Sequence, residues 1–308
     1  MSGSVQAAAS PSPAVSQSFL VSHLLGCSIL WASGFLFIKL SDDLSPFAIA
    51  AMRGLLGATS LAIWFKLKGK RLLPERQELK NWIVLGTFNG WLPNVLVAYA
   101  LTQITTASAA MVQAAGPLIV AVMSHALFPD ERLTRLRFVG VLIGFAGMGI
   151  LIGPAAIPQS GISPMGSLAM VAVTLSYATA NIFVRTIKQA DPSRLALGQQ
   201  VCSGLPATLL ALAITGPDAF AAVPSLVAPL LALGIVATAL PMLMFMHMIR
   251  RAGPTRASMV GYLLPVWTAI LAVLFLGERV GGREILGGAV VLAGVAIVTF
   301  SGKAKRPA

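Results

Sequence analysis

Amides, hydroxyls and aromatic rings gather near the middle of several long apolar segments of the sequence. In one segment Thr87, Gly90, Trp91 and Asn94 are spaced i, i+3, i+4 and i+7, so they share one face of a helix. Such groups suit a zwitterion with an apolar side chain, because amides hold its charged end and rings pack its side chain. We therefore expect a binding site lined by Trp31, Trp91, Asn94, Gln113, Tyr177, Asn181, Tyr262 and Trp267.

The same residues have a second interpretation, in which they only hold the helices together. Isolated Asn and Gln side chains commonly form hydrogen bonds between helices inside a membrane, and aromatic rings commonly fill the core. The residue types and their spacing leave both interpretations open.

Acidic groups are missing from the middle of the apolar segments. All ten Asp and Glu residues lie in connections or near segment ends, as do the three His residues. Arg53 alone is charged within a segment, which makes it a functional candidate. Its place near one end also suits a snorkelling or helix-pairing arginine. Without an acid, histidine or nucleophile cluster, we expect no metal, no cofactor and no enzyme.

The composition indicates that lipid surrounds the segments that carry these residues. The chain of 308 residues is 56% hydrophobic and 10% charged, whereas soluble domains have about 25% charged residues. About 20 apolar residues cross a bilayer as a helix. We expect an all-α membrane protein with ten spans, at about 19–40, 46–66, 81–101, 106–127, 136–153, 163–186, 194–214, 227–249, 256–276 and 284–301.

The basic residues predict how the helices are oriented. If the connection 66–80 is cytoplasmic, 18 of the 22 Lys and Arg residues lie on that side and only Lys39, Arg279 and Arg283 lie opposite. The positive-inside rule then places both termini in the cytoplasm. Because the charges lie between apolar segments rather than on one face, we expect lipid rather than nucleic acid as the partner.

The sequence contains an internal repeat. WASGFLFIK (31–39) resembles YATANIFVR (177–185), and Glu-Arg follows the long apolar run of both 108–133 and 256–280. Five spans in each half would insert the halves in opposite orientations, which is an inverted-topology repeat. Residues that recur at a separation of 148 are Gly86 and Gly234, Pro93 and Pro241, Met111 and Met259, and Pro117 and Pro265.

The repeat divides the chain into segments. We expect a disordered cytoplasmic tail at 1–18, five-helix repeats at 19–153 and 163–301, and a basic cytoplasmic tail at 302–308. Proline within a span kinks its helix. Because Pro93, Pro117, Pro241 and Pro265 recur in matched pairs, we interpret them as hinges or cavity-shaping bends, with static curvature as the alternative.

Four features resemble the EamA family of the drug/metabolite transporter superfamily. They are LWASGFLFIK in the first span, PFAIAAMRGLLGA in the second, the proline-centred fourth and ninth spans, and LGERV before a glycine-rich last span. The chain is most similar to bacterial inner-membrane exporters of aromatic amino acids, of the YddG-like type. The resemblance implies a central cavity formed by spans 1, 3, 4, 6, 8 and 9. Gln199 departs from the repeat, because it stands where Arg53 stands in the first half.

The resemblance and the polar residues together predict a secondary transporter for small metabolites, favouring apolar or aromatic amino acids. A cationic-drug exporter is the first alternative, although it would need a buried acid. A phosphate or sugar-nucleotide carrier would need several buried cations. Carriage of a nucleobase or sugar derivative stays open. GxxxG patterns at 140/144 and 149/153 suggest packing between the fifth and tenth spans of a monomer, or a homodimer.

Overall fold

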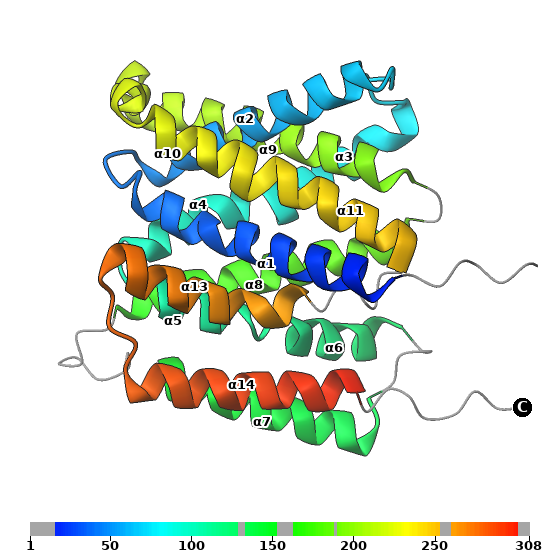
Figure 1. The fold of residues 1–308 in the computed structure, drawn as a ribbon, viewed down its shortest axis with the longest axis vertical. Helices are drawn as coiled ribbons and strands as arrows, with labels where there is room; N and C mark the ends of the chain where they lie inside the picture. Colours follow the sequence, from blue (N-terminus) through cyan, green and yellow to red (C-terminus); the bar gives the residue numbers. More distant parts are fainter. Residues whose placement is uncertain (1–15, 129–132, 153–162, 188–189, 253–259, 301–308) are drawn as a thin grey trace, which may run out of the picture.

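The computed structural model describes residues 16–128, 133–152, 163–187, 190–252 and 260–300, and these residues form helices and short connections. Figure 1 shows the long helices lying side by side, with their axes running in roughly the same direction across the molecule. The start of α1 (Gln17–Lys39), the connection after α2 (Pro46–Leu67) and the end of α14 (Gly282–Phe300) lie on the same side.

Several of the expected spans consist of more than one helical piece. The third span is α3 (Arg76–Gly86), the π-helix η1 (Thr87–Trp91) and α4 (Leu92–Leu101), and the eighth is α10 (Val227–Leu231), the π-helix η5 (Ala232–Ala239) and α11 (Leu240–Ala252). The fourth span is α5 (Thr106–Gln113) and α6 (Gly116–Leu127). The remaining long helices are α7 (Arg135–Ile152), α8 (Pro164–Thr186), α9 (Pro192–Thr215) and α13 (Val260–Leu276).

Seven helical stretches among the described residues are long and apolar enough to cross a membrane, and 263–276 forms a shorter apolar helix. Many large apolar side chains of these helices face outward, Leu209 at 69% exposure and Leu274 at 70% among them. Apolar surface of this extent needs lipid around it, so the chain is an all-helical, multi-pass membrane protein.

Short polar side chains begin the helices at the positions where the apolar runs start. Ser45 accepts a hydrogen bond from the Ala48 amide at 3.2 Å, and Pro46 follows as the first helical residue. Ser16 likewise accepts from the Phe19 amide at 3.1 Å. These caps satisfy amides that a first helical turn leaves unpaired. Because of the Ser16 cap, α1 begins within the range 1–18 that we expected to be a tail, and residues 1–15 lie outside the described part.

Helices far apart in the sequence pair along the stack. In Figure 1 α7 and α14 lie side by side at one end, and α2 packs with α9 at the other. Between them α1 packs against α13 and η5, while α8 packs against α4, α5 and α6. A core of small and branched side chains, including Ala48, Leu118 and Val291, joins these helices.

Glycines allow two of these pairs to approach closely. A Cβ atom placed on Gly54 of α2 would lie 2.5 Å from the Cα atom of Gly204 on α9. A Cβ atom on Gly294 of α14 would lie 2.5 Å from the backbone nitrogen of Gly144 on α7. The glycines at 140 and 144 therefore pack against α14 within one chain, as small residues do between membrane helices. In the part of the chain that the structure describes, no atom lies within 4 Å of such a Cβ on Gly149, and Gly153 lies outside that part.

Glu278, from the repeated Glu-Arg pair, joins the two halves of the sequence. Its carboxylate accepts hydrogen bonds from the Thr106 and Ala107 amides, at 3.0 and 3.3 Å, at the start of α5. A negative group at a helix N-terminus satisfies unpaired amides and interacts favourably with the helix dipole. Glu131, its counterpart in the repeat, lies outside the described residues.

Candidate substrate site

The two π-helices lie immediately before Pro93 and Pro241. A proline lacks the amide that would bond one turn back, so the helix before it can widen. In η1 the widening is marked at Gly90, whose backbone angles are φ −122° and ψ −110°. In the fourth span the helix breaks between Gln113 and Gly116, just before Pro117, whereas Pro265 lies inside the uninterrupted α13. Pro117 and Pro265 are matched in the repeat, but the backbone around them therefore has a different structure.

Arg53 lies about two turns into α2 and contacts the π-helix of the other half. Its Nε atom donates to the Thr238 Oγ1 atom of η5 at 3.0 Å. The Thr238 hydroxyl in turn donates to the Leu233 carbonyl at 2.7 Å, and Thr238 is only 3% exposed. Arg53 therefore extends into the interior instead of reaching the membrane surface.

Gln199 of α9 makes the corresponding contact with η1. The Asn89 Nδ2 atom donates to the Gln199 Oε1 atom at 2.8 Å, and the Gln199 Nε2 atom donates to the Asn89 carbonyl at 3.1 Å. Each half thus inserts one polar side chain against the widened helix of the other half. One of these side chains is neutral and paired through both amide atoms, while the other is cationic.

Asn94 and Tyr177, both predicted site residues, lie on helices that pack against this region, α4 against α2 and η1, and α8 against η1. Asn94 of α4 is 6% exposed, and its amide forms no hydrogen bond with a described residue. Tyr177 of α8 is partly buried against the main core and close enough to Arg53 for an electrostatic interaction. The amide of a buried residue usually has a hydrogen-bond partner, which makes Asn94 a candidate for contact with a bound molecule.

Trp31, Trp91 and Gln113 are all partly buried, but they lie in different surroundings. The Trp31 ring packs against Phe245 of α11, with ring centroids 5.0 Å apart. The Trp91 ring lies against a small core cluster of α2, α4 and α9, and its indole nitrogen donates to the Thr87 hydroxyl at 3.4 Å. Gln113 is the last residue of α5, at the helix break.

The remaining predicted residues lie on α8 and α13. Asn181 is exposed, one turn beyond Tyr177, and Trp267 is partly buried. Tyr262 belongs to α13, but its side chain lies outside the described part. The structure thus brings Tyr177 near Arg53. Contact of the eight residues with a substrate stays a prediction.

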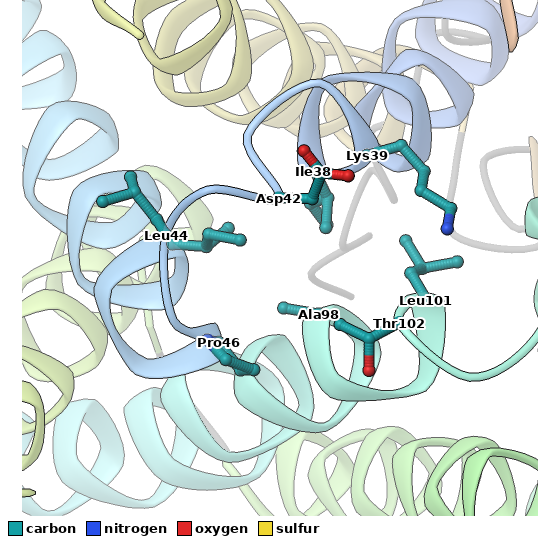
Figure 2. Close-up of a pocket in the computed structure, with 9 residues that line it drawn as sticks. Ile38, Lys39, Asp42, Leu44, Pro46, Ala98, Leu101 and Thr102 are labelled. Atoms are coloured by element: carbon teal, nitrogen blue, oxygen red, sulfur yellow. The ribbon is translucent and has the colours of Figure 1, made fainter. Parts of the chain in front are cut away.

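A pocket of about 270 Å³ opens at the end of the bundle where α1 turns into α2. Figure 2 shows Lys39 and Asp42, from the end of α1 and the turn, facing Ala98 and Thr102 at the end of α4. Neither Lys39 nor Asp42 forms an ion pair with a described residue. The pocket therefore has an apolar lining with one group of each charge at its edge.

The family model for EamA-like transporters matches residues 19–153 and again residues 164–300. The chain belongs to the EamA-like transporter family. The two matches are consistent with a duplicated repeat, and membership in a transporter family means that this EamA protein is not an enzyme.

Curated relatives of this EamA protein cover nearly its whole length. An uncharacterized transporter of Archaeoglobus fulgidus is 26% identical over 272 residues, covering 87% of this chain and 94% of the relative. A probable amino-acid metabolite efflux pump of Salmonella typhimurium is 26% identical over 292 residues, covering 91% and 94%. A crystal structure at 21% identity superposes with a TM-score of 0.65, covering 94% of this chain and all of the other, and shows that the fold is shared.

Arg53 is the residue whose surroundings the sequence interpretation did not foresee in this EamA protein. Its place near the end of a span suggested a snorkelling or helix-pairing arginine, and the side chain contacts another helix, η5 of the other half, although the sequence did not indicate which helix it would meet. The signal that could have found it is the pairing of position 53 with position 199, because both sites hold polar residues within an apolar span.

Proposed function

We propose that this protein is a secondary transporter that moves a small metabolite by alternating access, built as two five-helix repeats of opposite orientation. The observation that carries the proposal is the pair of contacts between Arg53 and η5 and between Gln199 and η1. Inverted-repeat transporters bind substrate near the midplane, beside interrupted helices. Here both widened helices lie against a polar side chain of the opposite half.

The packing of the helices also agrees with a two-fold relation between the repeats. The contact of α3 with α9 corresponds to that of η5 with α2, since each joins a third span to a second span of the other half. The contact of α1 with α13 corresponds to that of α8 with α5 and α6. Under this relation α2 and α9 pair with each other, as do α7 and α14.

The proposed repeats are residues 19–153 and 163–301, and the proposed location is a bacterial inner membrane with both termini in the cytoplasm. The basic residues favour this orientation, because the connection 66–80 is rich in Lys and Arg and the C-terminal segment carries Lys303, Lys305 and Arg306.

Cysteine accessibility tests the orientation. In a protein whose native Cys27 and Cys202 are replaced, a single cysteine within 154–162 should react with an impermeant maleimide added to intact cells. A single cysteine within 303–306 should react only after the membrane is opened, because a charged reagent does not cross lipid. The reverse pattern would contradict the proposed orientation.

The proposed substrates are apolar or aromatic amino acids, and the proposed physiological direction is export. The name of the Salmonella typhimurium relative, a metabolite efflux pump, favours this class. The partly buried rings of Trp31, Trp91, Tyr177 and Trp267 and the amide of Asn94 suit such a substrate. A cationic-drug exporter remains the alternative, together with a carrier of another metabolite such as a nucleobase or sugar derivative.

We further propose transport down the substrate gradient, with the disturbed backbone before Pro93, Pro117 and Pro241, together with Pro265 inside α13, serving as hinges. A proton-coupled carrier needs a group whose charge changes within its site, usually Asp, Glu or His. The acids of this chain lie in connections or near helix ends. Arg53 stays protonated at physiological pH.

Purified protein in liposomes tests this function. With a panel of labelled amino acids and no imposed gradient of pH or sodium, the internal concentration should rise to the external one and stop there. Empty liposomes measure leakage. Accumulation above equilibrium that requires a pH gradient would contradict passive transport and direct attention to His125 and His247. A panel in which no amino acid enters faster than into empty liposomes would overturn the proposed substrate class.

A further inference from the structure

Arg53 is a partly buried cation without an acidic partner in the described part of the chain. It forms no ion pair there, and the ten acids of the sequence lie in connections or near helix ends. An unpaired charge inside a membrane protein is costly, so such a group commonly has a functional partner.

The contact with Thr238 determines which edge of the guanidinium remains available. Arg53 has five N–H donors, and the bond to Thr238 uses the one on Nε. The Thr238 hydroxyl proton is already donated to the Leu233 carbonyl, so Thr238 accepts from Arg53 through a lone pair. The four N–H groups on the two Nη atoms have no acceptor among the described residues. Together they form the edge that binds a carboxylate through two parallel hydrogen bonds.

The pocket of Figure 2 is lined by residues that lie one helical turn along the sequence from Gly34, Arg53 and Asn94. Its lining includes Ile38 of α1, Ile49 of α2 and Ala98 of α4. Gly34, Arg53 and Asn94 lie four residues further along these three helices, toward the middle of the bundle. A spacing of four residues places them on the same helix faces as the pocket residues. Four residues advance a helix by about 6 Å, so these three residues form the next layer beneath the pocket.

Gly34 and Asn94 leave this layer suited to a polar ligand group. A Cβ atom on Gly34 would lie 3.8 Å from the Nη2 atom of Arg53, so no side chain of α1 covers the guanidinium there. Asn94 is a residue with 6% exposure, and its amide lacks a hydrogen-bond partner among the described residues. In the other half the amide of Gln199 is paired with Asn89 through both of its atoms, so it offers no equivalent binding edge.

We propose that Arg53 binds the carboxylate of the transported molecule through its two Nη groups, with the pocket of Figure 2 as the approach and Asn94 as a second contact. The inference rests on the proposed transport function and names its substrate class: monocarboxylates, amino acids included. An amine without a carboxylate is a poor ligand, because its charge is repelled by Arg53.

Three probes with the same ring test this assignment on the purified full-length protein. They are L-phenylalanine, 3-phenylpropionate, which lacks the amine, and phenethylamine, which lacks the carboxylate. We expect both carboxylates to raise the thermal unfolding midpoint and phenethylamine to leave it unchanged. In Arg53→Gln the affinity for both carboxylates should fall about 10- to 100-fold, since hydrogen bonds to charged groups are among the strong ones. The affinity of Arg53→Lys should lie between those of the wild type and Arg53→Gln, because lysine keeps the positive charge but cannot form two parallel hydrogen bonds with a carboxylate.

Two controls separate binding from folding. Lys66→Gln removes one positive charge from the exposed end of the same helix and should bind as the wild type does. Without ligand, Arg53→Gln should unfold no earlier than the wild type, because the variant removes a partly buried charge that has no acidic partner among the described residues. A helix-pairing arginine would instead give a lower midpoint.

The possible results distinguish this inference from the proposed function. If liposomes take up amino acids equally through the wild type and Arg53→Gln, the transport function stands and the role of Arg53 is wrong. If phenethylamine binds as well as phenylalanine, or neither carboxylate binds, the substrate class is wrong. If 3-phenylpropionate binds but no amino acid is transported, Arg53 is a carboxylate site and the proposed amino-acid transport is wrong.

Discussion

Replacing Gly147 by valine should leave little folded protein after extraction from the membrane. A Cβ atom at this position would lie 2.6 Å from the Val291 backbone nitrogen and 2.9 Å from the Gly287 carbonyl oxygen of α14. Backbone atoms cannot rotate away as a side chain can, so α7 and α14 would have to separate. Overpacking of this kind typically costs about 1–3 kcal/mol, and backbone contact places it at the upper end. Size-exclusion chromatography and a thermal unfolding curve in detergent measure the loss.

Gly149→Val is the matched control, two residues along the same helix. It makes the same change in helix propensity, but no atom of the described residues lies within 4 Å of a Cβ placed there. We expect its unfolding midpoint to stay close to that of the wild type. Equal losses in the two variants would show that the close packing of α7 on α14 is not the cause. A Gly149→Val variant that changed only the oligomeric state would instead indicate that this face meets a second copy.

Arg194→Ala should give the second large loss of stability. The Arg194 Nε and Nη2 atoms each donate to a Glu78 carboxylate oxygen at 2.6 Å. The Nη1 and Nη2 atoms also donate to the carbonyls of Arg71 and Leu73, at 2.7 and 2.8 Å. One side chain therefore joins the start of α9 to α3 and to the connection before it. Since hydrogen bonds to charged groups contribute about 1.5–3 kcal/mol each, we expect a loss of about 2–3 kcal/mol for this partly exposed group.

Arg71→Ala is the control for this prediction. Arg71 pairs with Glu75 at 3.2 Å, and both side chains are at least 60% exposed, so the pair should contribute below about 1 kcal/mol. Arg194→Lys should show an intermediate loss, because an ammonium cannot reach the carboxylate and both carbonyls in the same geometry. Thermal unfolding in detergent compares the three variants. Similar midpoints for Arg194→Ala and Arg71→Ala would mean that the links made by Arg194 contribute little.

The positions of the helices could be predicted well because lipid makes the requirement simple. A segment that crosses a bilayer must be apolar for about 20 residues and must satisfy its own backbone hydrogen bonds. The described helices therefore begin and end within a few residues of the expected spans, apart from the third, whose α3 starts at Arg76 on the polar turn that precedes the apolar run. Caps such as Ser45 and Asp191 precede prolines that are visible in the sequence.

The shapes of the helices at the prolines were less predictable. Each proline removes one hydrogen bond, and the neighbouring helices decide how the backbone relaxes. Before Pro93 and Pro241 it widens into a π-helix, before Pro117 the helix breaks, and at Pro265 it continues. The sequence alone predicts a disturbance at each of the four sites, but not its form.

The sequence by itself determined the membrane environment, the approximate spans, the internal repeat and the family, because these depend on composition and on order along the chain. The tertiary structure decided which polar side chains meet. Arg53 donates to Thr238 of η5 and lies near Tyr177, whereas Trp31 packs on Phe245 of α11. Depth along a helix can be counted from the sequence, but the direction a side chain faces depends on how each helix is rotated against its neighbours. Here glycine contacts such as that of Gly54 with Gly204 set that rotation, by allowing the backbones to touch.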